Sequence, residues 1–263
     1  MRLTPQEGEE MLLHGDPIAL GRLADAERHR RYPSDRVTFI IDRNINYTNV
    51  CVNECRFCAF FRRQGSRDAY LLSYDEILDK VRETVAAGGT QVMIQGGLYP
   101  DLGLEYYERM LRRIKEEFPG ITIHSFTATE IQHFARQAGL SILDTLKHLQ
   151  EAGLDSLPGG GAEILVDEVR RRVSPKKIMT DDWLHVMACA HSIGMESTAT
   201  MVIGFGETMA QRIEHMEKVR RLQDKTGGFR AFITWTFQPG HTALGGEKTS
   251  GWDYMRTLAV TRL

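Results

Sequence analysis

Three of the four cysteines lie close together, at Cys51, Cys55 and Cys58. Thiolates at this spacing suit zinc or an iron–sulfur cluster better than a hard cation such as Mg²⁺. A closed zinc site needs a fourth ligand, usually from a second closely spaced pair, and the sequence offers no such pair. The remaining cysteine, Cys189, falls inside a predicted helix, where a lone cysteine is most often a small buried apolar residue. We therefore expect the clustered thiols to hold a metal centre, with an iron–sulfur cluster favoured over zinc.

Short apolar runs alternate with amphipathic helical patterns along the chain and must position this triplet. Strands are predicted at residues 37–41, 91–95, 121–126, 154–157, 197–203 and 229–235, and helices at 4–31, 74–87, 105–118, 141–152, 181–192 and 208–226. Such alternation indicates βαβ units and a parallel sheet. The expected fold class is α/β, a partial TIM-type barrel of six βα units with N-terminal helices, since a complete barrel of this kind takes about 250 residues.

Residues that do chemistry in parallel α/β folds usually follow the carboxyl ends of the strands. The segments that leave the predicted strands are rich in glycine, small polar residues and possible ligands. They are residues 46–60, 95–98, 124–129, 158–163, 204–208 and 236–242. Histidines and carboxylates near these exits are candidate catalytic groups for proton transfer, namely His124, Asp155 and His241.

The composition excludes several classes of partner. The 263 residues include 33 Lys and Arg against 35 Asp and Glu, for a formal net charge of -2, so no basic field points to nucleic acid. The basic stretch at 170–172 with Lys176 and Lys177 is interpreted as a solvated helix end. No apolar run approaches the roughly 20 residues of a membrane-spanning helix, and the N-terminus lacks a signal-peptide pattern. We expect a cytoplasmic protein that acts on a small molecule.

The spacing C-x3-C-x2-C, with the aromatic Phe57 directly before the last cysteine, resembles the signature of the radical S-adenosylmethionine (SAM) superfamily. The resemblance implies that Cys51, Cys55 and Cys58 hold a [4Fe–4S] cluster with one iron left open for SAM. It also implies a donor such as flavodoxin or ferredoxin, whose electron cleaves SAM to a 5′-deoxyadenosyl radical that takes hydrogen from the substrate. A non-catalytic, zinc-stabilised binding module is the alternative from another class.

The same resemblance implies SAM contacts at the strand exits. The glycines after 91–95 would receive the SAM amino group, segment 158–163 would pass close to the nucleoside, and segment 201–208 would pack along adenine. The residues so implied are Phe57, Gln95, Gly96, Gly97, Glu163, Ile203 and Glu207. A plain strand-to-helix turn, with an acidic residue near the helix start, is the alternative for segment 201–208.

Longer stretches narrow the resemblance to the futalosine-pathway enzymes of menaquinone biosynthesis. These stretches are NYTNVC, CRFCAF, LDSLPGGGAEIL and LQDKTGGFRAFI. Residues 89–98 and 236–242 favour the cyclase branch over the alternatives, aminofutalosine synthase and the related deazaflavin synthases. The cyclase branch implies removal of the ribose C4′ hydrogen from dehypoxanthine futalosine and ring closure on its aryl ring. A carboxylate on that ring would need a cationic or amide partner, for which Arg62 and Gln238 are candidates.

Three regions are expected along the chain. They are an N-terminal helical extension at 1–36, the radical SAM barrel core at 37–243, and the start of a C-terminal region at 244–263. The chain stops within an apolar helical pattern at 254–260, and the resemblance implies a longer C-terminal portion. We therefore expect this chain to be a truncated form of the enzyme.

Overall fold

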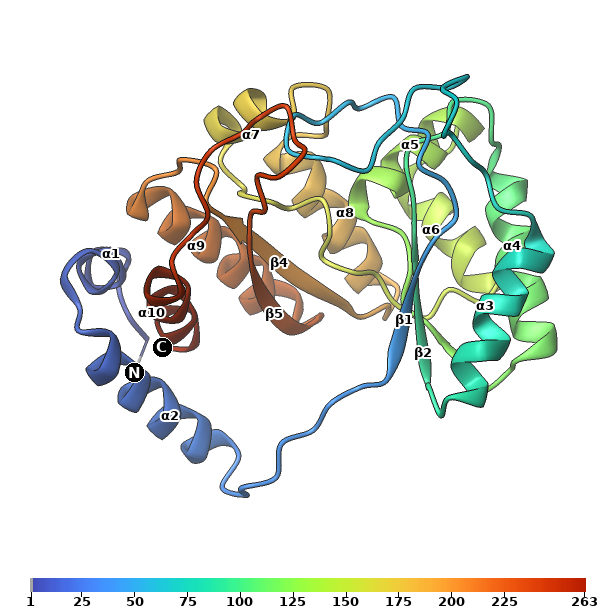
Figure 1. Cartoon of the computed structure of the whole chain (residues 1–263). Coiled ribbons are helices and arrows are strands. Elements are labelled where there is room, and N and C mark those ends of the chain that lie inside the picture. The colour runs from blue at the N-terminus through green and yellow to red at the C-terminus, as the bar shows by residue number, and fades with distance from the viewer. Residues whose placement is uncertain (1) are drawn as a thin grey trace.

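Strands and helices alternate through most of the chain, and the computed structural model describes residues 2–263 (Figure 1). The strands are β1 (Asp42–Asn46), β2 (Gln91–Gln95), β3 (Thr122–Ile123), β4 (Ser197–Ile203) and β5 (Phe229–Thr236). The helices are α1 (Pro5–His14), α2 (Pro17–Arg31), α3 (Tyr74–Ala86), α4 (Leu104–Glu117), α5 (Ala128–Ala138), α6 (Ile142–Glu151), α7 (Asp167–Val173), α8 (Thr180–Ser192), α9 (Met209–Thr226) and α10 (Gly251–Arg262).

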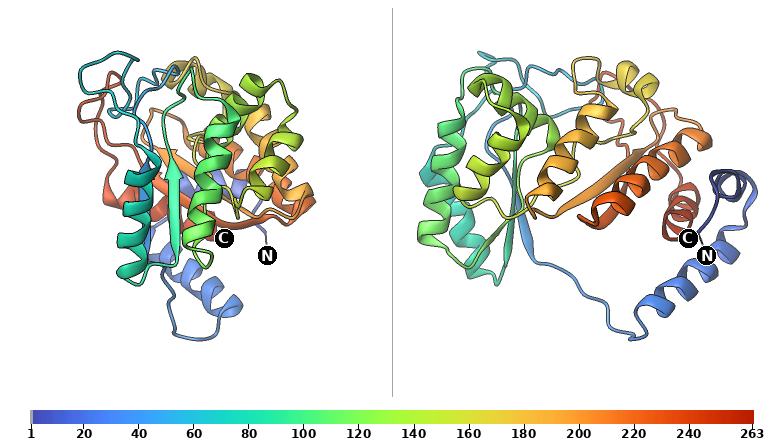
Figure 2. Two further views of the ribbon diagram at one scale, coloured as in Figure 1. Left: turned by 90° about the vertical axis from the view of Figure 1, so that its right-hand side faces the viewer. Right: turned by 180° about the vertical axis from the view of Figure 1, so that it is seen from behind.

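The strands form one curved parallel array. β1, β2 and β3 pair in that order, and β4 pairs with β5. Single parallel bridges from His124 to Ser156 and from Leu157 to Ser197 join the two sheets. Seen from behind, the helices from α4 to α9 form an outer layer in front of the strands (Figure 2). The array is an incomplete barrel with β1 and β5 at its open edges, which confirms the predicted α/β class.

The predicted strand at 37–41 is wrong. This segment is extended chain outside the sheet, and Val37 and Phe39 are 76% and 86% exposed. Pairing with β2 begins only at Asp42. An apolar, β-branched run indicates a strand only where a neighbouring strand is available, and periodicity does not report that neighbour. The predicted strand at 154–157 is likewise reduced to the two single bridges.

Capping residues set the helix boundaries. The predicted helix at 4–31 is two helices, because Asp16 accepts a hydrogen bond from the Ala19 amide at 2.8 Å and Pro17 occupies the first turn of α2. Two helices, α5 and α7, lie in segments where no helix is predicted. α5 begins with a capping box, in which the Glu130 carboxylate accepts from the Thr127 amide at 2.8 Å. This T-x-x-E pattern is a helix-start signal that the sequence does carry.

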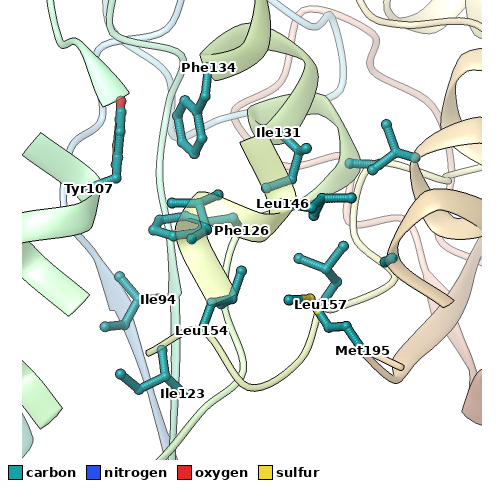
Figure 3. Close-up of a cluster of buried hydrophobic side chains, with 14 of the residues drawn as sticks. Ile94, Tyr107, Ile123, Phe126, Ile131, Phe134, Leu146, Leu154, Leu157 and Met195 are labelled. Carbon is teal, nitrogen blue, oxygen red and sulfur yellow. The ribbon is translucent and has the colours of Figure 1, made fainter. Parts of the chain in front are cut away.

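The main hydrophobic core lies between the strands and the outer helices. The Phe126 ring contacts those of Tyr107 and Phe134, with centroids 5.6 and 5.2 Å away. Figure 3 shows these rings beside Ile94 and Ile123, the outward-facing residues of β2 and β3. Burial of several aromatic rings contributes strongly to stability. The core therefore fixes the positions of β2 and β3.

The N-terminal helices pack against the last helix. Leu12 of α1, Leu20 of α2 and Val260 of α10 belong to one buried cluster, and Figure 1 shows α1 and α2 beside α10. The termini are thereby held beside each other although they are far apart in sequence. None of the helices in residues 2–263 is long and apolar enough to cross a membrane.

A buried ion network ties the exit of β4 to α9 and α10. Arg212 Nε donates to Glu207 at 2.8 Å, and its terminal nitrogens donate to Asp253 at 2.7 and 2.9 Å. The Glu207 side chain is 1% exposed and also accepts from the Gly204 and Phe205 amides. Arg212 is the nearby cation that compensates this buried carboxylate.

Replacing Arg212 by alanine should lower the free energy of unfolding by about 3 kcal/mol or more, because Glu207 would be left buried without a counterion. Urea unfolding followed by circular dichroism measures the change. Arg221→Ala is the matched control, since its ion pair with Glu217 is exposed on the Arg side and such a pair contributes under about 1 kcal/mol. Equal unfolding midpoints for the two variants would contradict the role given to Arg212.

Candidate functional site

One cavity of about 260 Å³ collects the exits of four strand segments. The loop after β1 contributes all three clustered cysteines, and residues 95–98 after β2 form the adjacent wall. Residues from 127–130 and 160–163, with Lys177, complete the lining. Figure 1 shows the long loop between β1 and α3 crossing the end of the barrel where these exits meet. The structure thus brings together segments that lie more than a hundred residues apart.

Backbone hydrogen bonds hold the cysteine loop in place. The Cys51 amide donates to the Arg62 carbonyl at 3.0 Å, and the Arg62 amide donates to the Asn49 carbonyl at 2.7 Å. The Asn49 side chain bridges the far end of the loop, accepting from the Tyr70 amide and donating to the Asp68 carbonyl, both at 2.9 Å. The thiols therefore project from an ordered loop that is closed on itself.

Gly96 and Gly97 let β2 approach this loop at backbone distance. A Cβ atom at Gly97 would stand 2.1 Å from the Val50 carbonyl oxygen, and one at Gly96 would stand 2.7 Å from the Tyr47 ring. Neither position can hold a side chain without moving the loop. The two glycines line the cavity as predicted, but packing against residues 47–51 already requires them.

The cysteines share the cavity without converging on a single point. No three His, Cys, Asp or Glu side chains in residues 2–263 are grouped as they would be around one metal ion. A cluster whose separate irons each take one thiolate needs thiols that face a common space, and Cys51, Cys55 and Cys58 all line this cavity. Burial raises the pKa of the Cys55 thiol to about 12, against the influence of Lys177. Binding of a metal centre would therefore release a proton from Cys55.

A buried carboxylate, Glu163, and a cation, Lys177, form the opposite wall, and Arg170 lies behind them. Lys177 Nζ donates to Glu163 at 2.6 Å and lies 5.5 Å from the centre of the Phe57 ring. Burial works against the Lys177 charge, but Glu163 and Cys55 outweigh it, so its pKa is raised. Arg170 is 1% exposed and donates to the carbonyls of Gly161 and Ile178, both at 3.0 Å. The interpretation of this basic stretch as a solvated helix end is therefore wrong for Arg170 and Lys177.

Glu130 is a site residue that the sequence analysis misses. Its carboxylate is buried and accepts from the Tyr47 hydroxyl at 2.9 Å and the Gly96 amide at 3.0 Å. Burial raises the pKa of Glu130, and burial with the neighbouring Glu130 charge raises that of Tyr47. The signal that could have found Glu130 is the capping box that starts α5. Through it, one carboxylate joins α5, the β2 exit and the start of the cysteine loop.

The structure separates the residues predicted to contact SAM into two groups. Phe57, Gln95, Gly96, Gly97 and Glu163 all line the cavity. Ile203 and Glu207 do not, because Ile203 is fully buried in a second apolar cluster and Glu207 is bound to Arg212. Segment 201–208 has the geometry of the plainer alternative, a strand-to-helix turn whose acidic residue holds the loop amides.

None of the three candidate catalytic groups lines the cavity. Asp155 accepts from Lys115 Nζ and the Ile123 amide, both at 2.7 Å, and so joins the end of α4 to β3. His124 is buried directly after β3, with Nδ1 2.7 Å from the Ser156 hydroxyl. His241 is exposed in the loop after β5. Apart from His124, which faces the barrel interior, these positions have no geometric support as catalytic groups.

The two candidate substrate contacts are also outside the cavity lining. Gln238 is exposed and its side chain donates to the Thr236 hydroxyl at 3.1 Å. Arg62 is paired with Asp68 and donates to the carbonyls of Ala59 and Phe61 within the cysteine loop. Arg62 is therefore engaged in holding the loop rather than being free for a ligand.

Two buried oxygens in the cavity wall lack partners. Within residues 2–263, Glu163 Oε2 and Thr129 Oγ1 are buried and make no hydrogen bond, although the Arg170 guanidinium lies 4.0 Å from Glu163 Oε2. An unpaired buried polar atom costs free energy, so its presence beside a cavity indicates that a polar ligand completes it. Three thiols, a glycine-lined wall and unpaired oxygens together fit an iron–sulfur cluster with a polar cofactor beside it.

Comparison with known proteins agrees with this geometry. The model of the radical SAM superfamily matches residues 45–219. The chain is 45% identical to the cyclic dehypoxanthine futalosine synthase of Streptomyces coelicolor, over 100% of this chain and 67% of the relative. It is 43% identical to the enzyme of the same name from Halalkalibacterium halodurans, over 100% of this chain and 71% of the relative.

Among solved structures, the FeFe-hydrogenase maturase HydG of Carboxydothermus hydrogenoformans matches with a TM-score of 0.79 at 19% identity. The match covers 99% of this chain and 60% of that chain, and it concerns the fold alone. The family match, by contrast, includes all three cavity cysteines and the segments opposite them. With its thiols, glycines and barrel so placed, the chain belongs to the radical SAM superfamily, whose members use a [4Fe–4S] cluster and SAM.

Proposed function

We propose that this chain forms cyclic dehypoxanthine futalosine from dehypoxanthine futalosine, a step of menaquinone biosynthesis. The observation that carries the proposal is the meeting of three thiols with the unpaired oxygens of Glu163 and Thr129 in one cavity. The choice among radical SAM reactions is supported by identity of 45% and 43% to relatives of this name. A reaction on a nucleoside-like small molecule also fits the near-neutral net charge of -2.

The cavity residues have distinct tasks in this reaction. When bound, the cluster and SAM supply a 5′-deoxyadenosyl radical that removes the C4′ hydrogen of the substrate. Cys51, Cys55 and Cys58 hold the cluster on the ordered loop, and Glu163 is placed to accept hydrogen bonds from ribose hydroxyls of SAM. Lys177 holds the Glu163 side chain in place by donating to it at 2.6 Å. Positioning of this kind is the main contribution of a protein to cofactor chemistry.

The proposal includes a partner and a location. A one-electron donor such as flavodoxin or ferredoxin would reduce the cluster, and the reaction would take place in the cytoplasm. The cytoplasm keeps thiols reduced, which a site built on three cysteines requires. His124 and His241 have no catalytic role in this proposal, because neither lines the cavity.

Anaerobic loading with iron and sulfide should give a brown protein that cleaves SAM and converts dehypoxanthine futalosine. Cys55→Ala should lose both the iron–sulfur absorption and product formation, because the cluster loses one of its three protein ligands. Cys189→Ala is the control, since Cys189 lies on α8 and is absent from the cavity lining. A loaded protein that binds one zinc and no iron would favour the binding-module alternative.

Deuterium distinguishes the cyclase from aminofutalosine synthase. Substrate labelled at C4′ should pass its deuterium into 5′-deoxyadenosine, as measured by mass spectrometry, because the proposed step breaks that C–H bond. The synthase instead adds the adenosyl radical to an enol substrate. Unlabelled 5′-deoxyadenosine formed alongside cyclised product would rule out abstraction at C4′.

Glu163→Gln should weaken SAM binding to the loaded protein by about 10- to 100-fold, because a hydrogen bond to a charged group contributes roughly 1.5–3 kcal/mol. Equilibrium dialysis measures the dissociation constant without requiring turnover. Glu168→Gln is the matched control, because Glu168 lies on α7 and outside the cavity lining. Unchanged SAM affinity in Glu163→Gln, with the cluster intact, would remove Glu163 from the SAM site.

A further inference from the structure

The inner face of the incomplete barrel is polar along β2 and the first half of β4, whereas β5 adds Ile233 and Trp235 to it. On β2 the outward residues Val92 and Ile94 enter the main core, so Gln91, Met93 and Gln95 face inward. The same alternation on β4 turns Ala199 to the core, which leaves Thr198 and Thr200 on the inner face. Closed barrels of this type usually fill their interior with bulky branched residues. The polar inner face therefore indicates space for a polar ligand rather than a packed core.

A cationic side chain reaches across this face from β5. Arg230 stands where the β4–β5 register shifts, because Ser197 pairs with Phe229 whereas Thr198 pairs with Ala231. One terminal nitrogen of its guanidinium lies 3.2 Å from His124 Nδ1 and 3.2 Å from the Ser156 hydroxyl. His124 and Ser156 are themselves 2% exposed and joined at 2.7 Å. Three strand segments thus fix the position of one guanidinium.

The charge of Arg230 has no counterion in residues 2–263. Many other arginines pair with a carboxylate, as Arg43 does with Glu83 and Arg212 with Glu207, but no carboxylate oxygen of the described residues lies within 4.0 Å of the Arg230 guanidinium. Its remaining nitrogens make no hydrogen bond within the described residues. Burial, with the Arg230 charge, lowers the pKa of His124 to about 4, so His124 is neutral near pH 7. The cluster therefore has one net positive charge and unused donors.

Strand register places this cluster below the cavity that holds the cysteines. Val92 pairs with Ile123, so the residue directly after β3, His124, lies level with Met93. Gln95, which lines the cavity, is the next inward residue after Met93. Two residues of a strand span about 7 Å. A ligand of nucleoside size is long enough to extend from the cavity to this level of the barrel, where the Arg230 side chain is exposed.

We propose that Arg230, held by His124 and Ser156, binds the aryl carboxylate of the substrate. This inference rests on the proposed function, which supplies a substrate with such a carboxylate. A guanidinium with unused donors matches a carboxylate in charge and in its fork of two hydrogen bonds. The single positive charge, with neutral His124 and Ser156 beside it, matches a monoanion. Arg230 takes the place of Arg62, whose donors are occupied in the cysteine loop.

Steady-state kinetics of the loaded enzyme test the role of Arg230. Arg230→Gln should raise KM for dehypoxanthine futalosine by about 10- to 100-fold, because a charged hydrogen bond is lost, with a smaller change in kcat. The KM of Arg230→Lys should lie between those of the wild type and Arg230→Gln, since lysine keeps the positive charge but cannot donate two parallel hydrogen bonds to one carboxylate. Arg112→Gln on the exposed side of α4 is the control. The dissociation constant for SAM should be unchanged in all variants.

The methyl ester of the substrate carboxylate provides the decisive comparison. For the wild-type enzyme, KM should be higher for the ester than for the acid, by a factor similar to the rise in KM that Arg230→Gln causes. The Arg230→Gln variant should have similar KM values for the two compounds. A variant that keeps the wild-type KM, or still discriminates against the ester, would overturn the assignment. Failure of the proposed function gives a different result, in which the wild-type enzyme cleaves SAM but converts neither compound. In that case, binding of benzoate to the loaded wild type and to Arg230→Gln, compared by calorimetry, decides the carboxylate site, and equal affinities would refute it.

Discussion

The position of all three thiols depends on a contact that leaves no room for a side chain at Gly97. The Gly97 amide donates to the Thr48 carbonyl at 3.0 Å, and the Val52 amide donates to the Leu98 carbonyl at 3.2 Å. The cysteine loop is therefore bonded to the exit of β2 almost as a further strand would be. Behind β2 stands the aromatic core of Figure 3. The core holds β2 in place, and β2 in turn holds the cysteine loop. A cluster site needs a loop held in this way, because small displacements of the ligands weaken binding.

Charge in the cavity is arranged for a loaded site. Glu163 has a left-handed backbone with φ 41°, a conformation that costs energy for a residue other than glycine. That conformation aims its carboxylate at Lys177, with Arg170 4.0 Å away. Arg170 is outside the cavity lining and donates to backbone carbonyls, so Lys177 is the cation that faces the cysteines. Thiolates formed on metal binding would add negative charge on the side that Lys177 faces.

The sequence predicts the metal-binding residues and most strands of this protein, but not the contacts that other side chains make in the site. Cysteine spacing depends on adjacent residues, and strands such as Gln91–Gln95 and Ser197–Ile203 have patterns complete within themselves, so these were predictable. Lys177 and Glu130 were not, because each acquires its role from a partner distant in the chain: Glu163 for one and Tyr47 for the other. The apolar run at 37–41 failed for the same reason, since a strand is defined by its neighbour.

Successive side chains of a strand point to opposite faces of the sheet, so residues that stabilise the core alternate with residues that can contact a ligand. The outward residues of β2 and β3, Val92, Ile94 and Ile123, enter the core and cannot change without a loss of packing. The inward residues between them contact no core, and a substitution there alters the lining of the barrel alone. A substitution at an inward position below the cavity, such as Met93, would therefore change the barrel lining without moving the cysteine loop. The bulge at Arg230 follows this logic, because one extra residue in β5 turns a charge to the inside without moving Phe229 or Phe232 from the core.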